Sequence, residues 1–380
     1  MIAPVYIAFV LFGASLGYAV VLTAWRERLR KARAEERAPT EDAPPVSMVV
    51  PARNAEHTLV PLLQDLNAQD LPKDQVQVIV VDDHSSDGTA GIVLGMVARW
   101  PQLQYKPNVG EGKKAAIACG VKDALHDVII LTDADARCGR QRVRVIAEVM
   151  AKDRLDLLIL PVRTAGNGTF LGRLQEEEQA ALLGMAMGQA LLGRPGLAYG
   201  ANLAFRREAF EAVGGYGGDR FASGDDVFLV QRMRKAGKTL GVLADMDALV
   251  TVEAEPTWRG FLTQRLRWAG KMRGVRGGMP WMGLFALFLP WALCWASVRL
   301  TAADIIAPDG VETLLMVIFG WLLWVVPTTA LVREVRRMLG QRRMAMVTVM
   351  CQMLFTVYAP LVAILSLVYH PRWKGRRVVR

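Results

Sequence analysis

Residues Val128–Arg137 read VIILTDADAR, and this stretch decides how the rest of the chain is interpreted. It opens with four apolar residues, three of them β-branched, which is typical of a buried parallel strand. Asp133 and Asp135 follow at the carboxyl end, where open α/β sheets bind their ligands. Two carboxylates so spaced suit Mg²⁺ or Mn²⁺ that shares its other ligand positions with a diphosphate. A polar turn that closes a strand has the same composition, so this stretch alone leaves both interpretations open.

The composition indicates membrane segments and gives little support to several other classes. Hydrophobic residues make up 52% of the 380 residues, and the net charge is +10. The length allows one large domain or two, and a basic balance fits anionic lipid as well as nucleic acid. The 4 histidines are dispersed, and the 4 cysteines are scattered without a CxxC pair. A disulfide framework, a zinc site and a histidine metal site are therefore not predicted.

The N-terminal segment predicts a membrane anchor. Met1–Trp25 carries no charge, and a basic cluster begins at Arg26. About 20 apolar residues cross a bilayer, whereas a signal peptide carries its basic region before the apolar core. This order predicts an uncleaved anchor over 1–25, followed by a basic, Pro-rich linker over 26–46. Because basic residues stay in the cytoplasm, we expect the next domain to be the cytoplasmic domain of an inner-membrane protein.

The segment 47–255 alternates strand-like and helix-like patterns. This alternation predicts βαβ units and an α/β fold with a mainly parallel, Rossmann-like sheet. Polar residues follow the carboxyl ends of three of the expected strands, so we expect one ligand site at that edge of the sheet. The expected strands are Val46–Val50, Val76–Val81, Val128–Leu131 and Leu157–Val162, and the expected helices include Thr58–Leu66, Gly112–Leu125 and Arg140–Lys152.

Seven short motifs occur in one order over residues 47–268. They are VVPARN at 49–54, VDDHSSDGT at 81–89, GKK at 112–114, TDAD at 132–135, GAN at 200–202, GDD at 224–226 and QRLRW at 264–268. The ordered set resembles the membrane-integrated family-2 glycosyltransferases with a GT-A fold. It is most similar to the enzymes that glycosylate ceramides, carotenoids and related lipids, and to the smaller polysaccharide synthases.

The resemblance implies a role for each motif. Asp226 would be the catalytic base of an inverting enzyme, Asp135 would hold a divalent metal, and the QxxRW motif would close over the diphosphate. Asp83 would contact the base, and a carboxylate can accept from uracil N3–H, which suits a UDP-sugar. The donor or nucleotide set would be Pro51, Arg53, Asp83, Lys113, Asp133, Gln264, Arg267 and Trp268, and the acceptor side would hold Asn202 and Asp225.

Lys113 belongs to a glycine-rich stretch with two other interpretations. A Walker A loop is excluded, because Pro107 and Lys114 stand where its first Gly and its Ser or Thr belong. A dinucleotide fingerprint fits poorly, because two lysines would occupy the close turn. A solvated helix start remains the alternative to a lysine that contacts the nucleotide.

The acidic and basic motifs also have simpler explanations. Asp225 and Asp226 would be favoured by the dipole in the first turn of a helix, and that explanation suffices for Asp225. The segment 256–278 predicts an interfacial amphipathic helix, in which the QxxRW residues share one face. Its alternative is a membrane-surface helix with snorkelling arginines. For Glu176–Glu178 we expect a solvated face and assign no role.

The C-terminal part predicts further membrane segments over 279–370, followed by a basic tail over 371–380. Its three uncharged runs are Met279–Val298, Thr313–Val332 and Met344–Tyr369. With the anchor they would place the basic tail outside, against the positive-inside tendency. One run is therefore a candidate for a re-entrant segment, and the sequence does not decide which.

Together these patterns predict a cytoplasm-facing, metal-dependent, inverting glycosyltransferase of family 2. It would move a sugar, a hexose from UDP, to a membrane lipid acceptor, with no nucleic acid partner. A processive polysaccharide synthase is one alternative. A catalytically silent membrane scaffold or transport component that kept the fold is another, from a different class.

Overall fold

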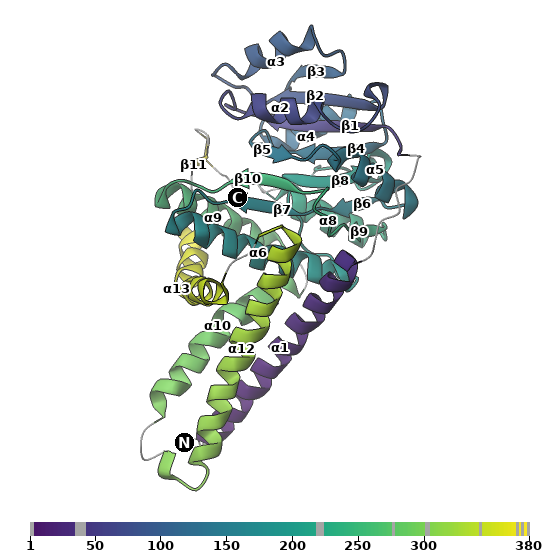
Figure 1. Cartoon of the computed structure of the whole chain (residues 1–380). Helices are drawn as coiled ribbons and strands as arrows, with labels where there is room; N and C mark the ends of the chain where they lie inside the picture. Colours follow the sequence, from purple (N-terminus) through teal and green to yellow (C-terminus); the bar gives the residue numbers. More distant parts are fainter. Residues whose placement is uncertain are drawn as a thin grey trace.

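The structure is a computed structural model of the chain, and it describes residues 4–34, 43–217, 224–275, 278–300, 305–341, 344–369, 372–373 and 376–377. Most of the expected linker after Ala34 and most of the basic tail lie outside these residues. An α/β domain stands on a stalk of long helices (Figure 1).

The elements follow the expected alternation. The strands are β1 Val46–Ala52, β2 Val76–Asp82, β3 Leu103–Pro107, β4 Val128–Thr132, β5 Ala136–Cys138, β6 Leu157–Ile159, β7 Val162–Ala165, β8 Asn202–Arg206, β9 Leu240–Val242, β10 Val250–Glu253, β11 Arg372–Trp373 and β12 Arg376–Arg377. The helices are α1 Pro4–Ala34, α2 Leu59–Asn67, α3 Thr89–Val97, α4 Lys113–Lys122, α5 Arg142–Lys152, α6 Phe170–Leu191, α7 Arg207–Ala212, α8 Asp225–Lys235, α9 Trp258–Lys271, α10 Met279–Arg299, α12 Gly310–Met338 and α13 Ala345–Val368, with short 3₁₀ turns η1 Lys73–Gln75 and η2 Met272–Gly274.

The main sheet has 7 strands in the order β3-β2-β1-β4-β8-β6-β9. Strands β1 to β4 run parallel, as do β6 and β9, so the prediction of a mainly parallel α/β sheet is confirmed. Strand β8 is antiparallel to both of its neighbours and is absent from the expected elements. Its five residues, NLAFR, are too short a run to distinguish from a loop.

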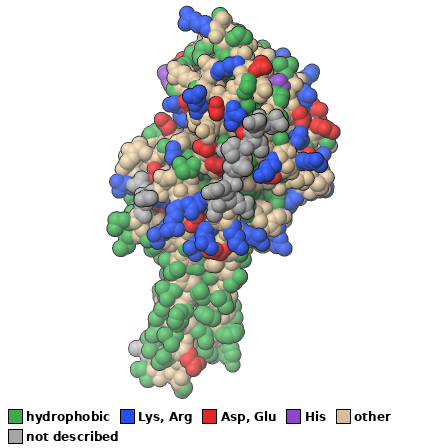
Figure 2. Space-filling model, turned by 45° about the vertical axis from the view of Figure 1, so that its right-hand side comes forward, with side chains coloured by type: hydrophobic (Ala, Val, Ile, Leu, Met, Phe, Trp, Pro, Cys, Tyr) green, Lys and Arg blue, Asp and Glu red, His purple; other side chains and the backbone are tan. Residues whose placement is uncertain are grey.

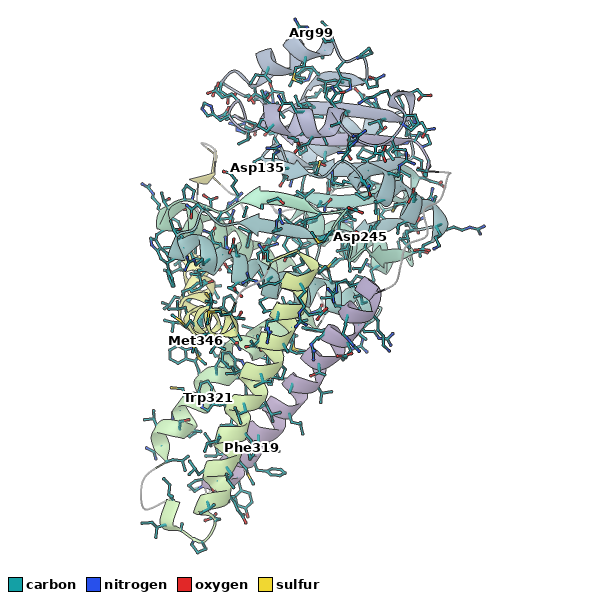
Figure 3. All side chains as sticks on the ribbon, in the orientation of Figure 1. Arg99, Asp135, Asp245, Phe319, Trp321 and Met346 are labelled. Carbon is teal, nitrogen blue, oxygen red and sulfur yellow. The ribbon has the colours of Figure 1, made fainter. Side chains whose placement is uncertain are left out.

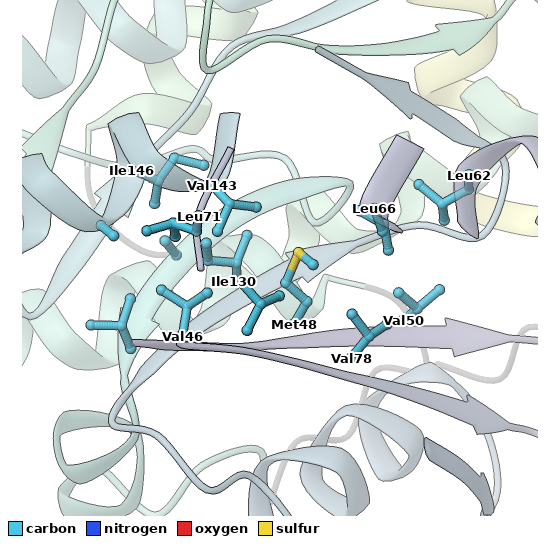
Figure 4. Packing of buried hydrophobic residues seen from close by; sticks show 14 of the residues in the cluster. Val46, Met48, Val50, Leu62, Leu66, Leu71, Val78, Ile130, Val143 and Ile146 are labelled. Carbon is cyan, nitrogen blue, oxygen red and sulfur yellow. The ribbon is translucent and has the colours of Figure 1, made fainter. Parts of the chain in front are cut away.

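Helices cover both faces of this sheet. Because strand side chains alternate, Met48 and Val50 of β1 pack towards α2 and α5, whereas Val49 packs towards α4 and α8. Figure 4 shows the first of these cores, where Leu62 and Leu66 of α2 meet the strand residues. The two cores hold the strand ends rigidly, as a precise ligand site requires.

A small second sheet changes one expected strand. Its order is β5-β10-β7, so the run Leu157–Val162 is not one strand. It divides into β6 of the main sheet and β7 of the small sheet. Pro161 lies between them and has no N–H to donate, which explains the break.

The stalk consists of α1, α10 and α12, which extend away from the domain (Figure 1). Helix α1 runs on through the basic cluster to Ala34, so the first part of the expected linker is helical. Figure 2 shows an apolar stalk below a belt of Lys and Arg side chains. Four helices of the described residues, α1, α10, α12 and α13, are long and apolar enough to cross a membrane. The number of predicted membrane segments agrees with this finding.

The expectation of a solvated face for Glu176–Glu178 is wrong. All three side chains are buried on α6, between the domain and the stalk. Glu177 pairs with Arg336 of α12, and Glu178 accepts a hydrogen bond of 2.8 Å from Arg265 Nε of α9. A buried carboxylate needs such partners. They come from segments distant in the chain, so the local sequence does not reveal them.

Candidate functional site

The three parallel strands β1, β2 and β4 end side by side at one edge of the sheet. Ala52 pairs with Asp82 at the ends of β1 and β2, and the parallel register continues between β1 and β4. The antiparallel strand β8 begins at the same edge, because Asn202 pairs with Thr132 at the end of β4. The GAN motif therefore lies beside the TDAD motif, although some 70 residues separate them.

Asp83, in the loop after β2, is hydrogen-bonded to residues in the loops after β1 and β3. Its carboxylate Oδ1 accepts from Asn108 Nδ2 at 2.8 Å and from the backbone N of Gly112 at 2.9 Å. An Arg53 guanidinium nitrogen donates to the Asp83 carbonyl at 2.9 Å and lies 3.7 Å from its carboxylate Oδ2. Pro51 precedes this contact by two residues in β1. The residues predicted to bind the nucleotide at this end thus form one connected surface.

Lys113, the first residue of α4, joins two of the acidic motifs. Its ammonium lies 2.7 Å from Asp133 Oδ1 and 3.1 Å from Asp225 Oδ2. Burial would lower the pKa of Lys113, but the charges of Asp133 and Asp225 raise it well above its ordinary value. The ammonium of Lys113 therefore stays charged between the TDAD and GDD motifs. Because it is paired with two carboxylates, Lys113 is not a solvated residue at the start of a helix.

Asp226 lies at the start of α8 and is almost completely buried. Its Oδ2 accepts from the backbone N of Gly200 at 3.2 Å, and its Oδ1 accepts from Val227 N at 2.7 Å. The ammonium of Lys271, the last residue of α9, lies 3.2 Å from Asp226 Oδ1. Gly200 and Lys271, from two segments distant in the chain, therefore help to fix the position of this carboxylate.

Gly200 lies so close to the ends of two charged side chains that an added Cβ would displace them. A Cβ atom at this position would lie 2.5 Å from Asp225 Oδ2 and 2.9 Å from Lys113 Nζ. Both distances are shorter than the contacts of real Cβ atoms. The backbone of the GAN motif can therefore approach the paired charges closely, and its N–H can reach Asp226.

Asp225 and Asp226 belong to one charge network of alternating sign. Burial would raise the pKa of Asp225, but Lys113 and Lys271 lower it below its ordinary value of 3.8. Buried charges are tolerated when each has an opposite partner. Because two lysines from different helices satisfy the GDD carboxylates, the dipole of α8 is not the only reason for acidic residues here.

The QxxRW residues of α9 face this network from the other side. Burial lowers the pKa of Arg267, while the nearby charges of Glu255, Asp133 and Asp135 oppose that shift. Arg267 therefore lies within electrostatic reach of the TDAD carboxylates. A guanidinium can bind phosphate oxygens with two donors. Since Lys271 follows Arg267 by four residues on the same helix, both cations lie on one face.

Gln264 and Trp268 make contacts within the protein. Gln264 Nε2 donates to Glu255 Oε1 at 3.3 Å. The guanidinium of Arg265 lies 4.5 Å from the ring centroid of Trp268 and 4.4 Å from that of Phe261. Trp268 is therefore held against Arg265, which Glu178 in turn holds. These contacts fix the orientation of α9 relative to the sheet edge.

Asp135 is the exposed member of the TDAD pair. It lies in the turn that joins β4 to β5 (Figure 3). Within the described residues no three His, Cys, Asp or Glu side chains form a metal-binding group. A hard cation at this edge would therefore use few protein carboxylates and complete its shell with other oxygens, as Mg²⁺ does with substrate phosphates.

Asn202 differs from the other predicted residues. It is fully buried, and its Nδ2 donates to the carbonyls of Pro161 at 2.6 Å and Ala248 at 2.8 Å. Its Oδ1 accepts from the guanidinium of Arg142 at 2.8 Å. These bonds occupy its amide in joining β8 to the neighbouring segments. The geometry favours a structural role for this residue over a place on the acceptor side.

Sequence reasoning missed Lys271 as a site residue. Its ammonium pairs with Asp226 of the site. The only signal was the spacing of four residues from Arg267. Tyr199, next to Gly200, was also missed, and burial and the charge of Asp226 raise the pKa of its hydroxyl above the ordinary value.

The fold and the site define a GT-A type α/β domain attached to apolar helices. Residues 47–214 match the family described as Glycosyl transferase family 2. The chain thus contains a family-2 glycosyltransferase domain, and that prediction is confirmed.

Similar proteins agree with this class. A probable glycosyltransferase, YdaM, of Bacillus subtilis is 28% identical over 243 residues, which cover 62% of this chain and 54% of the relative. A beta-monoglucosyldiacylglycerol synthase of Synechocystis sp. is 28% identical over 229 residues, which cover 57% of this chain and 47% of the relative. The chain therefore spans about half the length of these curated relatives.

A solved structure has the same fold over almost the whole chain. It is the mannosyltransferase PcManGT from Pyrobaculum calidifontis in complex with GDP-Man and Mn²⁺. The similarity has a TM-score of 0.54 at 21% identity and covers 94% of this chain and 99% of that one. At this identity it establishes the fold, including the arrangement of a GT-A domain with further helices.

Proposed function

We propose that the protein is an inverting glycosyltransferase that moves one sugar from a nucleotide-sugar to the hydroxyl group of a membrane lipid. The observation that carries the proposal is the network around Asp226. Gly200 N and Lys271 hold this carboxylate, while Lys113 joins the adjacent Asp225 to the TDAD motif. A buried, positioned carboxylate beside a nucleotide-type site suits general base catalysis.

The proposed reaction is a single displacement. The acceptor oxygen forms a bond to the anomeric carbon as the bond from that carbon to the diphosphate oxygen breaks. The nucleoside diphosphate leaves with the bonding electron pair, and the configuration at the carbon inverts. Asp226 accepts the proton of the attacking hydroxyl, and Arg267 and Lys113 would supply positive charge to the diphosphate.

Asp83 and Arg53 would hold the nucleotide at the ends of β1 and β2. Asp133 would take part through its pair with Lys113. Gln264 and Trp268 would position Arg267 by fixing α9, rather than by contact with the sugar. The donor nucleotide, which we expect to be UDP, is part of the proposal.

A divalent ion, Mg²⁺ or Mn²⁺, fits the exposed Asp135 at this edge. Carboxylate oxygen is a ligand that both ions accept. When bound, it would offset the charge that develops on the departing diphosphate. The complex of the structural neighbour with Mn²⁺ supports the idea that this fold accommodates such an ion.

A lipid acceptor is supported by the position of the site above the stalk. Helix α9 ends at Lys271, and α10, an apolar helix, begins at Met279. The acceptor side of Asp226 therefore lies close to the place where the domain meets the apolar helices. One relative is named as a synthase of a glycosylated diacylglycerol, which fits the same acceptor class.

The decisive experiment measures the product of the purified full-length protein. Labelled UDP-hexoses and GDP-mannose would be offered separately, with Mn²⁺ and a membrane lipid extract. We expect a chloroform-soluble product that carries one sugar. An Asp226→Asn variant serves as the control for contaminating transferases.

Two other outcomes would change the proposal. A long, water-soluble polymer made by the chain alone would favour the polysaccharide synthase. A well-folded protein that turns over none of the donors would favour a silent scaffold or transport component. We also propose that the protein lies in the inner membrane with its α/β domain in the cytoplasm, where nucleotide-sugars are made. A cysteine placed at Thr40 should then resist an impermeant thiol reagent in intact cells.

A further inference from the structure

Helix α13 is as long and apolar as a membrane span, but it does not extend along the stalk. In Figure 1 it lies beside α6 and α9, at the domain end of α1, α10 and α12. We propose that α13 is immersed in the leaflet next to the domain and does not cross the bilayer. The chain then crosses the membrane three times, and both ends of α13 lie on the side of the domain. This inference does not depend on the proposed transfer reaction.

Charged pairs at the domain end of α12 mark the membrane boundary. Arg33 of α1 lies 3.1 Å from Glu334, and Arg336 pairs with Glu177 of the domain. Arg333 and Arg337 on the same turns are exposed. Charged side chains are costly within hydrocarbon. The surface of the bilayer therefore lies near this part of α12, and the rest of α12 extends into the membrane.

The first half of α13 stays close to that boundary. Thr348 Oγ1 donates to Glu177 Oε2 at 3.0 Å, and the ring of Tyr358 lies 5.5 Å from the ring of Phe261 on α9. From Thr348 to Tyr358 the helix is about 15 Å long, which is half the roughly 30 Å of hydrocarbon. An upright helix would bring Tyr358 to the middle of the bilayer. It contacts instead the helix that carries Arg265.

The part of α13 between Thr348 and Tyr358 lies at a limited depth below the surface of the bilayer. Thr329 Oγ1 donates to Gln352 Oε1 at 3.4 Å, and Trp291 Nε1 of α10 donates to the carbonyl of Thr356 at 2.9 Å. Thr329 is separated from Arg336 by about 10 Å along α12. This turn of α13 therefore lies within one leaflet, which is roughly 15 Å thick.

The segment after α13 lies on the side of the domain. Strand β11 begins at Arg372, so three residues join it to the end of α13 at Val368. Four chain steps span at most about 14 Å. Figure 1 shows β11 beside the α/β domain, above α9, and not at the far end of the stalk near the N-terminus. The carboxyl end of α13 must therefore also lie near the domain.

The two faces of α13 differ as an immersed helix requires. Val347, Cys351 and Tyr358 pack against Leu171 and Phe261 of the domain. An apolar stripe recurs every three or four residues on an exposed face, as expected for one side of a helix. The exposed large apolar residues of α13 are Met346, Met350, Met353, Leu354, Val357, Leu361, Ile364, Leu365, Leu367 and Val368.

The partner that fits this stripe is the hydrocarbon of one leaflet. In Figure 3, Met346 lies nearer to the domain than Trp321 and Phe319, which are on the membrane part of α12. Helix α13 carries no charged residue, so it is not an amphipathic helix with a charged face. It is held in the leaflet because its other face packs on the domain. Three crossings also return the basic C-terminal sequence to the side of Arg333, in agreement with the positive-inside tendency.

The test compares the accessibility of single cysteines on the full-length protein. In a background without the four native cysteines, one cysteine is introduced as Thr40→Cys before the domain, Pro308→Cys between α10 and α12, or Lys374→Cys after α13. Each variant is exposed to a membrane-impermeant maleimide in spheroplasts and in inverted vesicles. Protein in the membrane fraction at wild-type level shows that each variant is assembled.

We expect Lys374→Cys to react from the same side as Thr40→Cys and from the opposite side to Pro308→Cys. A Lys374→Cys variant that follows Pro308→Cys would mean that α13 crosses the membrane, and the proposal would be overturned. The comparison needs no assumption about which side faces the cytoplasm.

A depth measurement gives a second readout that does not require labelling of the tail. Fluorophores attached at Met346, Val357 and Val368 would be quenched with lipids brominated at shallow or deep positions. An immersed helix predicts that all three are quenched best within one leaflet. A crossing helix predicts deep quenching at Val357, with shallow quenching in opposite leaflets for the other two, and that result would also overturn the proposal.

Discussion

Lys271 Nζ lies 3.2 Å from Asp226 Oδ1 and thereby joins the last turn of α9 to the first turn of α8. Lys271 ends the helix that carries the QxxRW motif, and Asp226 is the proposed base. The pair therefore makes the position of the base depend on the position of the helix proposed to close over the diphosphate. It gives a physical reason for these two motifs to occur in one protein.

Replacing Lys271 with Met should reduce transfer strongly. The change leaves Asp226 buried with two backbone N–H donors but without the ammonium of Lys271. A misplacement of about 1 Å at a reacting group can cost roughly 10²-fold in rate. The measurement is kcat/KM for the donor with lipid acceptor. Arg259→Met removes an exposed cation from the same helix and should change the rate little. Equal effects of the two substitutions would assign Lys271 a general charge effect only.

Asp226→Asn should abolish transfer and keep nucleotide binding. The amide cannot accept the proton, and a general base contributes about 10²–10⁴-fold, whereas the nucleotide contacts are assigned to Asp83 and Arg53. Turnover and the Kd for the nucleoside diphosphate would be measured on one preparation. If the affinity collapses while turnover at saturation persists, Asp226 binds the donor and is not the base.

Gly200→Ala should inactivate the protein while leaving most of the fold intact. The added Cβ would lie 2.5 Å from Asp225 Oδ2, so the pair of Asp225 with Lys113 must separate. Overpacking of this kind costs about 1–3 kcal/mol. Gly95→Ala is the matched control, because its Cβ would meet nothing within 4 Å. Thermal melts and activity of both variants decide the matter, and wild-type activity of Gly200→Ala would refute the close approach.

Asp135→Asn should remove the dependence of transfer on a divalent ion along with most of the activity. The amide keeps the shape of the side chain but loses the charged oxygen that a hard cation prefers. Activity would be measured with EDTA, Mg²⁺ and Mn²⁺, and Mn²⁺ binding would be followed by its paramagnetic signal without donor. Undiminished activity of the wild type in EDTA would exclude the metal assignment.

The contribution of the Asp225 carboxylate to the stability of the folded protein should decrease at acid pH. Its pKa is lowered by Lys113 and Lys271 below 3.8, despite burial. A depressed carboxylate pKa contributes stability above its unfolded value, and that contribution is lost as the pH falls through the folded value. The difference in Tm between wild type and Asp225→Asn should therefore be full near pH 6 and shrink below about pH 4.

The control for this prediction is Asp74→Asn, which removes an exposed carboxylate from η1. It should change the Tm little at any pH. A difference between wild type and Asp225→Asn that stays constant from pH 6 to pH 3 would show that the carboxylate charge does not stabilise the folded protein.

The sequence by itself determined the fold class and the edge of the sheet where the site lies. Strands such as Val128–Thr132 are continuous apolar runs because both of their faces are covered by helices. Asp83 and Asp133 follow such runs directly, so the convergence of their loops is a consequence of parallel pairing. Length and hydropathy likewise identified the four apolar helices.

Only the tertiary structure decided which charges meet. Lys113, Asp225, Asp226 and Lys271 come from three helices, and no local pattern encodes a pairing between segments more than 40 residues apart. Burial of Glu177 and Glu178 likewise depends on partners from α12 and α9. An apolar helix has the same composition whether it crosses a bilayer or lies along it, because its side chains face hydrocarbon in both orientations. The orientation of α13 therefore had to come from its contacts with Glu177 and Phe261.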